Sequence, residues 1–432
     1  MTSLIYWMYK HRTVSSAALT LVLLILCYLW ENVPLSYGQS FDKLYFAERY
    51  IQRHFGHNEV VDDGLFINVG YDKAVADMDL YGMNGLFTGK VGITDRRTLD
   101  NFLSRLEEDG TYRYIFLDVR FEKGIETPYD SSLFSRIARM RDIVVATHRG
   151  VELASPLLEP KAYISDYKTT VTSTGFTRYQ FIQRGRTSVP LKIYEDLTGS
   201  GIKQVWRLPL YWSGKSICHN SVFVRIPEDF SENLVDVHTD GGKDSATGIH
   251  RQRYFDCGPQ IDEDFPLAEE AEGKIVVIGD FVEDVTGTYM GEQANPYLAY
   301  LAAKDLIRGR HKVSIPYACV LAILFFLTFM AVLSKEGKSV IFKGVDKMSG
   351  LLKRKGKSDR RGSGHSILGT FLWNLFEFSI STFLICVVLF LLFGATFSIF
   401  IPSLVFSLMA AVTQTWEHPD KKKENDETVH NA

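Results

Sequence analysis

Long apolar runs lie near both ends of the chain, and shorter ones lie between them. Residues 14–30 and 315–333 carry no charged side chain, and residues 371–412 carry only Glu377. A run of about 18 or more apolar residues is long enough to cross a bilayer as a helix. The last run is roughly twice as long as one span requires, so it predicts two helices joined near Gly394.

Four transmembrane helices follow from these runs, one near the N-terminus and three near the C-terminus. Lys10 and Arg12 precede the first run as they would in a signal peptide, but bulky Leu29 and Trp30 stand where a cleavage site needs small residues. We favour an uncleaved anchor, with a cleaved signal peptide as the alternative. The predicted helices cover residues 14–30, 315–333, 371–393 and 395–413.

The segment between the second and third predicted spans, residues 334–370, is strongly basic. It contains ten Lys or Arg and three acidic residues, so the positive-inside rule predicts that it is cytoplasmic. Four spans then put residues 1–13 and the polar tail, 414–432, in the cytoplasm and residues 31–312 outside. The basic segment also suits contact with anionic lipid headgroups. Neither interpretation requires nucleic acid, and we expect no nucleic-acid partner.

The external part of the chain alternates between short β-branched runs and amphipathic helical patterns. This order predicts an α/β domain with a mixed, largely parallel sheet. Between residues 161 and 266 the alternation of polar and apolar residues predicts an antiparallel extension or lid instead. The last strand should join the sheet of the first, and the last helix should cover that sheet and lead into the membrane. The predicted strands are 64–72, 112–121, 142–149 and 274–280, and the predicted helices are 95–109, 131–142 and 295–309.

Charged residues follow each of the four predicted strands. In open parallel sheets, ligands bind beyond the carboxyl ends of the strands, so these side chains form a candidate ligand site. The alternative is that they cap helices and satisfy loop backbone groups. The candidate residues are Asp72, Asp118, Arg120, Arg149, Asp280 and Asp284.

Cofactor and catalytic motifs are missing from the sequence. It has no G-x-G-x-x-G after a strand, no complete phosphate-binding loop, no G-x-S-x-G and no H-E-x-x-H. A loop with His238, Asp240, Asp244 and His250 has irregular spacing, and we interpret it as a solvated loop. We therefore expect no metal, no cofactor and no catalytic residues.

Two of the five cysteines, Cys218 and Cys257, fall in the predicted external domain. In an oxidising compartment they could form a disulfide, closing a loop of about 40 residues and adding about 4 kcal/mol of stability. The sequence leaves open whether they are bonded. The remaining cysteines lie in predicted spans, where they behave as small apolar residues. Glu377, also in a span, is interpreted as a snorkelling acid that meets a Lys or Arg, or else as a functional intramembrane acid.

Taken in order, several segments resemble the second class of CHASE domains, the cyclase and histidine-kinase associated sensory extracellular domains. They include NVGYDKAV (68–75), YIFLDVRF (114–121) and EGKIVVIGDFVEDVTGTYMGEQANPYLAYLAAKDLIRG (272–309). The resemblance covers roughly residues 14–412. It implies one anchor helix, an extracytoplasmic α/β sensor and three closing spans in the cytoplasmic membrane of a bacterium.

The sequence departs from the family pattern in two places. Thr286-Gly287 stands where the family often has Thr-Pro, so the loop after the last strand should have a different shape. Members usually continue into an effector after the last span, whereas here a short polar segment, WEHPDKKKENDETVHNA, follows. We expect a sensor that detects an unknown external ligand and signals to a separate cytoplasmic or membrane protein.

Two other classes of function stay open at this point. The first is a structural or scaffold subunit of an envelope complex, which would display an exposed apolar patch. The second is a membrane-anchored external enzyme, which would bring Asp72, Asp118 and Asp280 together in a pocket with a histidine nearby.

Overall fold

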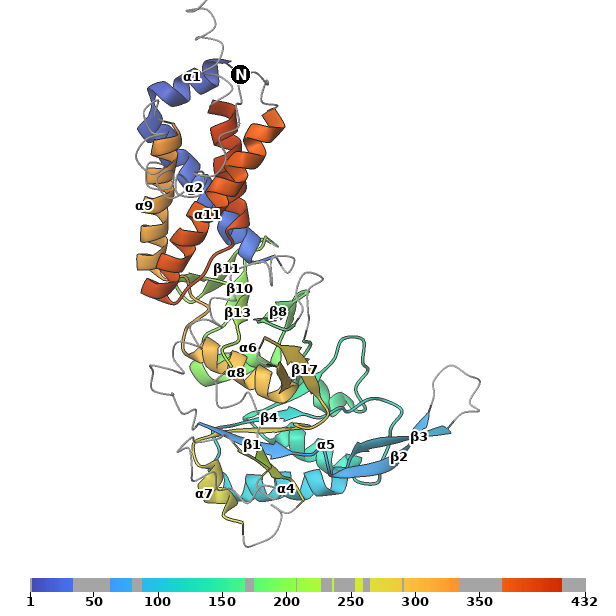
Figure 1. Cartoon of the computed structure of the whole chain (residues 1–432). Coiled ribbons are helices and arrows are strands. Elements are labelled where there is room, and N and C mark those ends of the chain that lie inside the picture. Colours follow the sequence, from blue (N-terminus) through green and yellow to red (C-terminus); the bar gives the residue numbers. More distant parts are fainter. Residues whose placement is uncertain are drawn as a thin grey trace, which may run out of the picture. The chain divides into compact units, whose positions relative to one another are not determined.

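A computed structural model describes most of the chain (Figure 1). The described residues are 2–33, 63–79, 88–167, 175–206, 208–226, 235–236, 253–258, 265–289, 291–333 and 367–413. The basic segment up to residue 366, the tail from residue 414 and the loop carrying His238 to His250 lie outside them. The chain forms two compact units, residues 45–312 and the two terminal segments 1–44 and 313–432.

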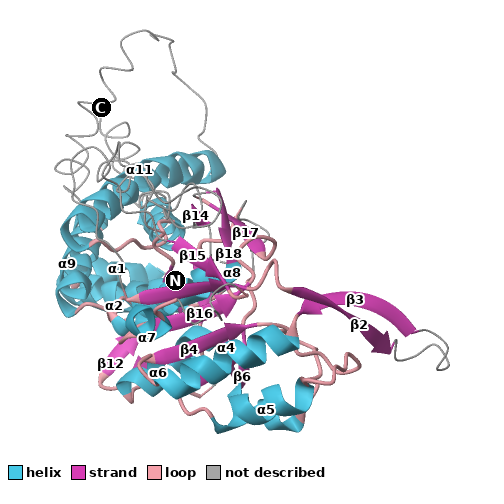
Figure 2. Ribbon diagram, turned by 90° about the horizontal axis from the view of Figure 1, so that it is seen from below, coloured by secondary structure: helices cyan, strands magenta, loops and turns pink. Residues whose placement is uncertain are grey.

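A seven-stranded sheet forms the centre of the 45–312 unit (Figure 2). All of its neighbouring strands are parallel. This confirms the predicted α/β class and all four predicted strands, but the sheet is parallel throughout and not mixed as predicted. The spatial order is β14 (Val235–Asp236), β15 (Arg253–Asp256), β1 (Gly64–Asn68), β16 (Ile275–Gly279), β4 (Tyr114–Asp118), β5 (Ile143–Thr147) and β6 (Ala162–Ile164).

Each face of this sheet is buried in its own hydrophobic core. Side chains alternate between the faces of a strand, so Phe66 of β1 enters one core while Leu65 and Ile67 enter the other. This explains why the strands are apolar throughout. One core is covered by α6 (Val189–Thr198) and α8 (Asn295–Ile307), and the other by α4 (Arg96–Asp109), α5 (Asp130–Arg139), η2 (Pro156–Lys161) and α7 (Leu267–Ala271).

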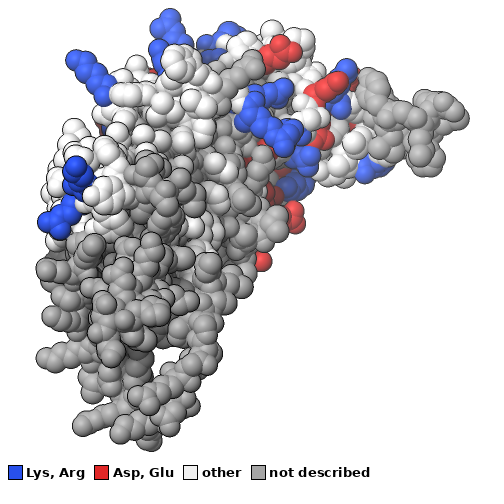
Figure 3. Space-filling view, turned by 90° about the horizontal axis from the view of Figure 1, so that it is seen from above, with Lys and Arg blue, Asp and Glu red and all other residues white. Residues whose placement is uncertain are grey.

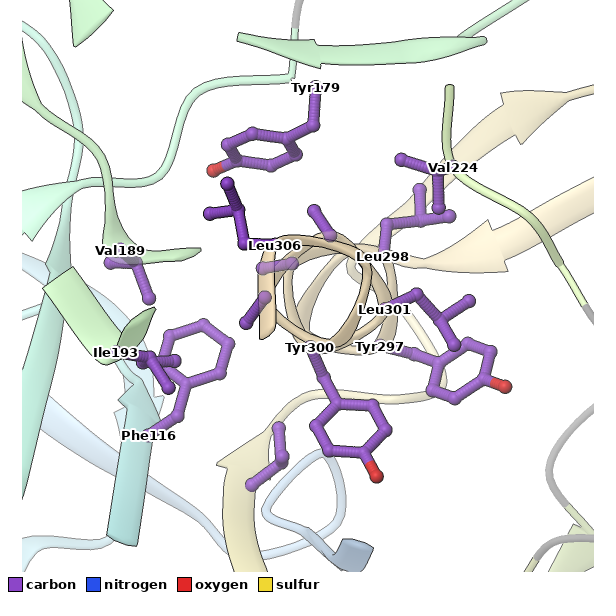
Figure 4. Close-up of a cluster of buried hydrophobic side chains, with 14 of the residues drawn as sticks. Phe116, Tyr179, Val189, Ile193, Val224, Tyr297, Leu298, Tyr300, Leu301 and Leu306 are labelled. Atoms are coloured by element: carbon purple, nitrogen blue, oxygen red, sulfur yellow. The ribbon is translucent and has the colours of Figure 1, made fainter. Parts of the chain in front are cut away.

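Helix α8 confirms the predicted helix but not its predicted role as an outer cover. Every residue from Asn295 to Leu306 is buried. Viewed along its axis, the helix has large side chains on all sides, with Tyr179 and Val224 facing it from one direction and Phe116 and Ile193 from another (Figure 4). A helix that is apolar all round belongs inside a protein. The prediction failed because α6 packs beside α8 on the same face of the sheet, and β13 and β18 pack against further sides of α8.

The prediction of an antiparallel extension over residues 161–266 is correct only in part. Strands β14 and β15 of this region join the parallel sheet, and helix α6 was not expected. The antiparallel pieces are small: β7 (Arg178–Gln180) with β13 (Ser221–Phe223), β8 (Ile182–Gln183) with β9 (Arg186–Thr187), and β10 (Ile202–Gln204), β11 (Tyr211–Ser213) and β12 (Ser216–Cys218) together. Two hairpins complete the unit, β2 (Lys73–Asp79) with β3 (Thr88–Thr94) and β17 (Val285–Thr288) with β18 (Gly291–Ala294).

Cys218 and Cys257 are not joined by a disulfide in this structure. Cys218 ends β12 and belongs to the core under α6 and α8, whereas Cys257 follows β15 and belongs to the other core. A disulfide requires Cα atoms within about 7 Å of each other. The sheet between the two cores separates this pair.

The terminal segments form helices, of which three are long and apolar enough to cross a membrane. The apolar run at 371–412 is divided as predicted, because Gly394 adopts a left-handed φ of 60° and its amide caps the preceding helix. After this break a shorter apolar helix covers Phe400–Thr413. The other helices are α1 (Thr2–Lys10), α2 (Arg12–Glu31), α9 (Ile315–Val332) and α11 (Ile367–Phe393).

These helices share one apolar core and expose apolar side chains outward. Phe325 and Phe329 of α9 pack against Phe406, whereas Leu21 and Leu391 are exposed. An apolar outer surface suits hydrocarbon as the solvent, and the unit fits a multi-pass membrane protein. The carboxylate of Glu377 accepts a hydrogen bond of 2.7 Å from the indole of Trp373, and no Lys or Arg in the described part of the chain pairs with it.

The 45–312 unit ends next to a buried histidine, His311. The ring of His311 is 5.2 Å from that of Tyr194 and 6.5 Å from that of Phe181. Neither of its ring nitrogens finds a hydrogen-bond partner in the described part of the chain, and burial lowers the pKa of His311 to about 4. Burial likewise lowers the pKa of neighbouring His219 to about 3.

We expect His311 to make the fold sensitive to acid. The pKa of His311 in the folded chain lies below the ordinary value of about 6.5. As the pH falls, the unfolded chain therefore binds a proton at His311 before the folded chain does. The stability it contributes is present above about pH 6.5 and falls by roughly 3 kcal/mol by pH 4. The unfolding midpoint of the wild type should therefore drop relative to that of His311→Phe between pH 7.5 and 4.5. A difference that stays constant over this range would refute the expectation.

Candidate functional site

At one point on the carboxyl edge of the sheet, the segments that follow two neighbouring strands lie on opposite faces of the sheet. Strand β16 lies between β1 and β4. The chain leaving β4 leads to α5 on one face, whereas the chain leaving β16 leads through the β17–β18 hairpin to α8 on the other. Such places are where open α/β sheets bind ligands. The predicted site residues Asp118 and Asp284 both lie here.

Two acids and one amide form the centre of this point, and we call Asp118, Asp284 and Asn295 the Asp118 site. The side-chain amide of Asn295 donates to the Asp284 carboxylate over 2.6 Å, and its backbone N–H donates to the Asp284 carbonyl over 2.8 Å. Among the described residues, two acceptors of this site find no hydrogen-bond partner, Oδ2 of Asp118 and Oδ1 of Asn295. Only 9% of Asn295 is exposed. Buried acceptors without partners are rare in proteins and call for an explanation.

Burial perturbs both acids of the Asp118 site. It raises the pKa of Asp118 well above the ordinary value, and the nearby charge of Asp284 adds to the shift. Burial also raises the pKa of Asp284, against the opposing effects of Asn295, His148 and Arg120. Perturbed carboxyl groups at the edge of a sheet are typical of functional sites.

A glycine allows these groups to come together. A Cβ atom on Gly279, the last residue of β16, would lie 2.5 Å from Cγ of Pro296 and 3.2 Å from Cβ of Asp118. The first turn of α8 therefore packs directly on the strand end. This contact holds Asn295 beside the end of β4.

Replacing Gly279 with alanine should push the first turn of α8 away from the sheet. Proline is rigid, so it cannot yield as a flexible side chain would, and overpacking costs about 1–3 kcal/mol. Thermal unfolding of the purified chain should report this loss. Gly287→Ala is a matched control, because nothing lies within 4 Å of its added methyl group. Equal effects of the two substitutions would contradict the close packing.

Two tyrosines lie behind the site. The hydroxyl of Tyr167 donates to the carbonyl of Asn295 over 2.6 Å and lies 3.0 Å from Oγ of Ser165. Its ring is 5.5 Å from that of Tyr179. Burial raises the pKa of both tyrosines, and the charge of Asp118 contributes to each shift. Both hydroxyl groups stay protonated, and that of Tyr167 fixes the start of α8.

Asp280 ends β16 close to the site, but its carboxylate is already satisfied. It pairs with Lys73 at 2.9 Å and accepts from the amides of Val282 and Glu283. Burial alone would raise the pKa of Asp280, but these amides and Lys73 lower it below the ordinary value. Its role is to hold the turn after β16.

The other three predicted residues have separate surroundings. Asp72 accepts from the amide of Gly258 and lies near Asp256. Arg149 is exposed. Arg120 is 67% exposed and pairs with Glu122, although its charge reaches Asp284. Asp72, Asp118 and Asp280 thus have different neighbours: the Gly258 amide, Asp284 and Lys73.

Sequence patterns did not point to several residues that build the site. Asn295 looks like an ordinary helix start, and Tyr167 stands in a segment without a clear pattern. Arg96 looks like a surface charge, but it is buried with its guanidinium 4.3 Å from the centre of the Phe121 ring. It donates to the carbonyl of Arg120, and burial lowers its pKa to about 10. It therefore holds the loop after β4.

Charges of both signs occur together on the surface. On the face shown in Figure 3, described acidic and basic side chains lie beside one another, and much of the surface between them is uncharged. Proteins that bind nucleic acid through their backbone phosphates present a basic field. The mixed pattern of this face does not have that character.

Similarity to other proteins does not identify the chain. No protein-family model, no curated protein and no solved structure matches it. The case for a function therefore rests on the Asp118 site and on the helices.

Proposed function

We propose that the chain is a membrane-anchored sensor of the CHASE type whose domain binds a ligand at the Asp118 site. The observation that carries this proposal is the pair of buried acceptors without partners, Oδ2 of Asp118 and Oδ1 of Asn295. A bound ligand that supplies donors would remove this cost. Leaving a buried polar group unsatisfied costs about 1–3 kcal/mol.

The chemistry of the site suggests the class of ligand. Both unsatisfied atoms accept hydrogen bonds, and both acids carry negative charge when ionised. A complementary group is a cation that bears N–H donors, such as a primary ammonium or a guanidinium. A quaternary ammonium has the charge but no N–H groups, so it should bind less well.

Helix α8 supplies a route from the site to the membrane. Its first residue, Asn295, belongs to the site, and its last residue, Ile307, precedes the apolar helix α9 by only seven residues. Because α8 is buried on all sides, it resists bending and moves as a unit. A ligand that binds one position of α8 better than another would shift the population of the two positions.

The remaining parts of the proposal concern location and partners. The basic segment 334–370 favours a cytoplasmic position for that segment and an external one for the domain, in the cytoplasmic membrane of a bacterium. We propose that all four apolar segments span the membrane. The signal would then pass to a separate cytoplasmic or membrane protein.

A thermal-unfolding screen of the full chain in detergent tests the ligand site. The probes are butylammonium, butylguanidinium and, as a control of equal charge without N–H groups, butyltrimethylammonium. A ligand at 100 times its Kd raises stability by about 2.7 kcal/mol. We expect the first two probes to raise the unfolding midpoint and the third to have little effect.

Variants of the site residues test the location of the site separately from the chemical class of its ligand. Asp284→Asn should abolish the shift, whereas Asp72→Asn, at the same edge of the sheet, should preserve it. If none of the amines acts but an anion, sugar or peptide gives a shift that Asp284→Asn removes, the site stands and the ligand class is wrong. Shifts that survive in Asp284→Asn would refute the site itself.

A further inference from the structure

A small three-stranded sheet of the 45–312 unit presents an apolar outer surface. Ten large hydrophobic side chains are exposed among the described residues of this unit, and four of them lie in this short stretch. Concentrations of exposed apolar side chains commonly mark sites of contact with proteins or membranes. The four are Trp206, Leu208, Trp212 and Ile217, and we call them the Trp206 patch.

The register of the sheet explains why this surface is apolar. Lys203, Trp212 and Ile217 are directly paired across β10, β11 and β12, so their side chains share one face. All three are exposed. The opposite face is buried in the core under α6 and α8, through Ile202, Tyr211 and Cys218. The sheet therefore carries apolar side chains on both faces, one buried and one exposed, with Lys203 on its edge strand β10.

Trp206 is held outward by an unusual backbone conformation. Its φ is +48°, in the left-handed region that side chains other than glycine rarely adopt. Such a conformation costs on the order of 1–3 kcal/mol. Trp206 is nonetheless 89% exposed, so packing of its side chain against the described residues does not offset this conformational cost. Contact with something outside the chain would do so.

Backbone contacts link this sheet to the residues just before helix α9. Cys218 of β12 forms an isolated antiparallel bridge with Lys312, and the amide of His219 donates to the carbonyl of His311 over 2.8 Å. Helix α9 begins at Ile315. Only residues 313 and 314 separate Lys312 from this helix, which is apolar and long enough to span a bilayer.

Tryptophans elsewhere in the sequence support a role at the membrane surface. Trp7, Trp30, Trp373 and Trp416 flank the apolar runs, so the two on this sheet are the only ones in the external domain. Tryptophan favours the boundary between headgroups and acyl chains, because its ring is apolar and its N–H is polar. Exposed Lys203 and Lys215 suit the phosphate groups of lipids.

From these observations we infer that the Trp206 patch inserts into the headgroup region of the bilayer that holds the spans. The inference is independent of the Asp118 site. The contact would restrain the base of the domain, so that movement of α8 acts on α9 instead of tilting the whole domain.

Spin labelling of the full chain in lipid nanodiscs tests this inference. The label is placed at Trp206→Cys or Ile217→Cys in a Cys319→Ser background, because Cys319 is exposed and the other four cysteines are buried. The Ile217→Cys variant keeps both tryptophans. Leu157→Cys is the matched control, since Leu157 is exposed at 49% on η2, which packs in the opposite core.

Collision of the label with two reagents distinguishes lipid from water. Oxygen concentrates in acyl chains, whereas a soluble nickel chelate stays in water. We expect labels at 206 and 217 to be accessible to oxygen and shielded from nickel, and the label at 157 to show the reverse. Nickel accessibility at 206 and 217 equal to that at 157 would overturn the inference. Shielding that appears only in discs holding two copies would also overturn it and assign the patch to a dimer contact.

Discussion

Replacing Asp305 with alanine should destabilise the domain by about 3 kcal/mol, because removal of one partner of a buried ion pair leaves the other charge unpaired. Asp305 lies near the end of α8 with 3% of its surface exposed. It pairs with Arg310 and lies 3.5 Å from the amide of Arg225. For a domain of this size, the loss corresponds to a decrease of roughly 6–12 °C in the unfolding midpoint.

A double variant isolates the effect of the unpaired charge. Burial raises the pKa of Asp305 despite Arg310 and Arg225, so the pair itself adds little net stability. Asp305→Leu combined with Arg310→Met should therefore recover most of the lost stability. The measurement is thermal unfolding of both variants at pH 7.5. If the double variant were as unstable as Asp305→Ala, packing and not charge would be responsible.

Replacing Asp118 with asparagine should have the opposite effect and stabilise the protein by about 1–3 kcal/mol at neutral pH. The folded-state pKa of Asp118 is raised by burial, so the folded chain binds a proton that the unfolded chain has released. Stability then falls as the pH rises above the unfolded value of about 3.9 toward the folded pKa. Asparagine carries no charge and removes this loss.

The pH dependence is the decisive part of this prediction. The unfolding midpoint of Asp118→Asn should exceed that of the wild type at pH 7.5, and the difference should shrink as the pH approaches 4. The same variant should lose the response to butylammonium. A substitution that raises stability but abolishes binding is expected at a functional site, because such sites are often held in a less stable arrangement. A destabilised Asp118→Asn at pH 7.5 would show that the carboxylate has a structural role instead.

The sequence was sufficient to predict the centre of the fold. Strands buried on both faces are continuous apolar runs, so β1, β4, β5 and β16 could be located and the parallel sheet inferred. The division of the last apolar run followed from Gly394 and from the length of one span. Strands that join the sheet only by pairing with residues far away in the sequence could not be predicted. Strands β14 and β15 are too short and too polar to resemble strands of a central sheet.

The sequence predicted only some of the residues that meet at the carboxyl edge of the sheet. Strand ends identified Asp118 and Asp284, because the topology of a parallel sheet brings such residues to one edge. The sequence could not show that Asp280 is satisfied by Lys73, nor that Asp72 has other partners. It also could not identify Asn295, because that residue contributes through an unsatisfied oxygen, which only packing reveals.

Polar side-chain contacts hold both ends of α8. Asn295 joins the first turn to Asp284, and Asp305 joins the last turn to Arg310. Between these polar anchors the helix is buried on every side. A change at the Asp118 site therefore has a rigid element to act on, and that element is followed directly by the chain to α9.

The labelling rate of Cys319 tests this coupling most directly. Cys319 is the exposed cysteine of α9, and the other four cysteines are buried, so a maleimide should report on this helix in the full chain. We expect Asp118→Asn to change the rate by at least about twofold, as a modest shift between two positions of α8 would, and Asp72→Asn to leave it unchanged. Equal rates in the wild type and both variants would contradict a connection between the site and the membrane helix.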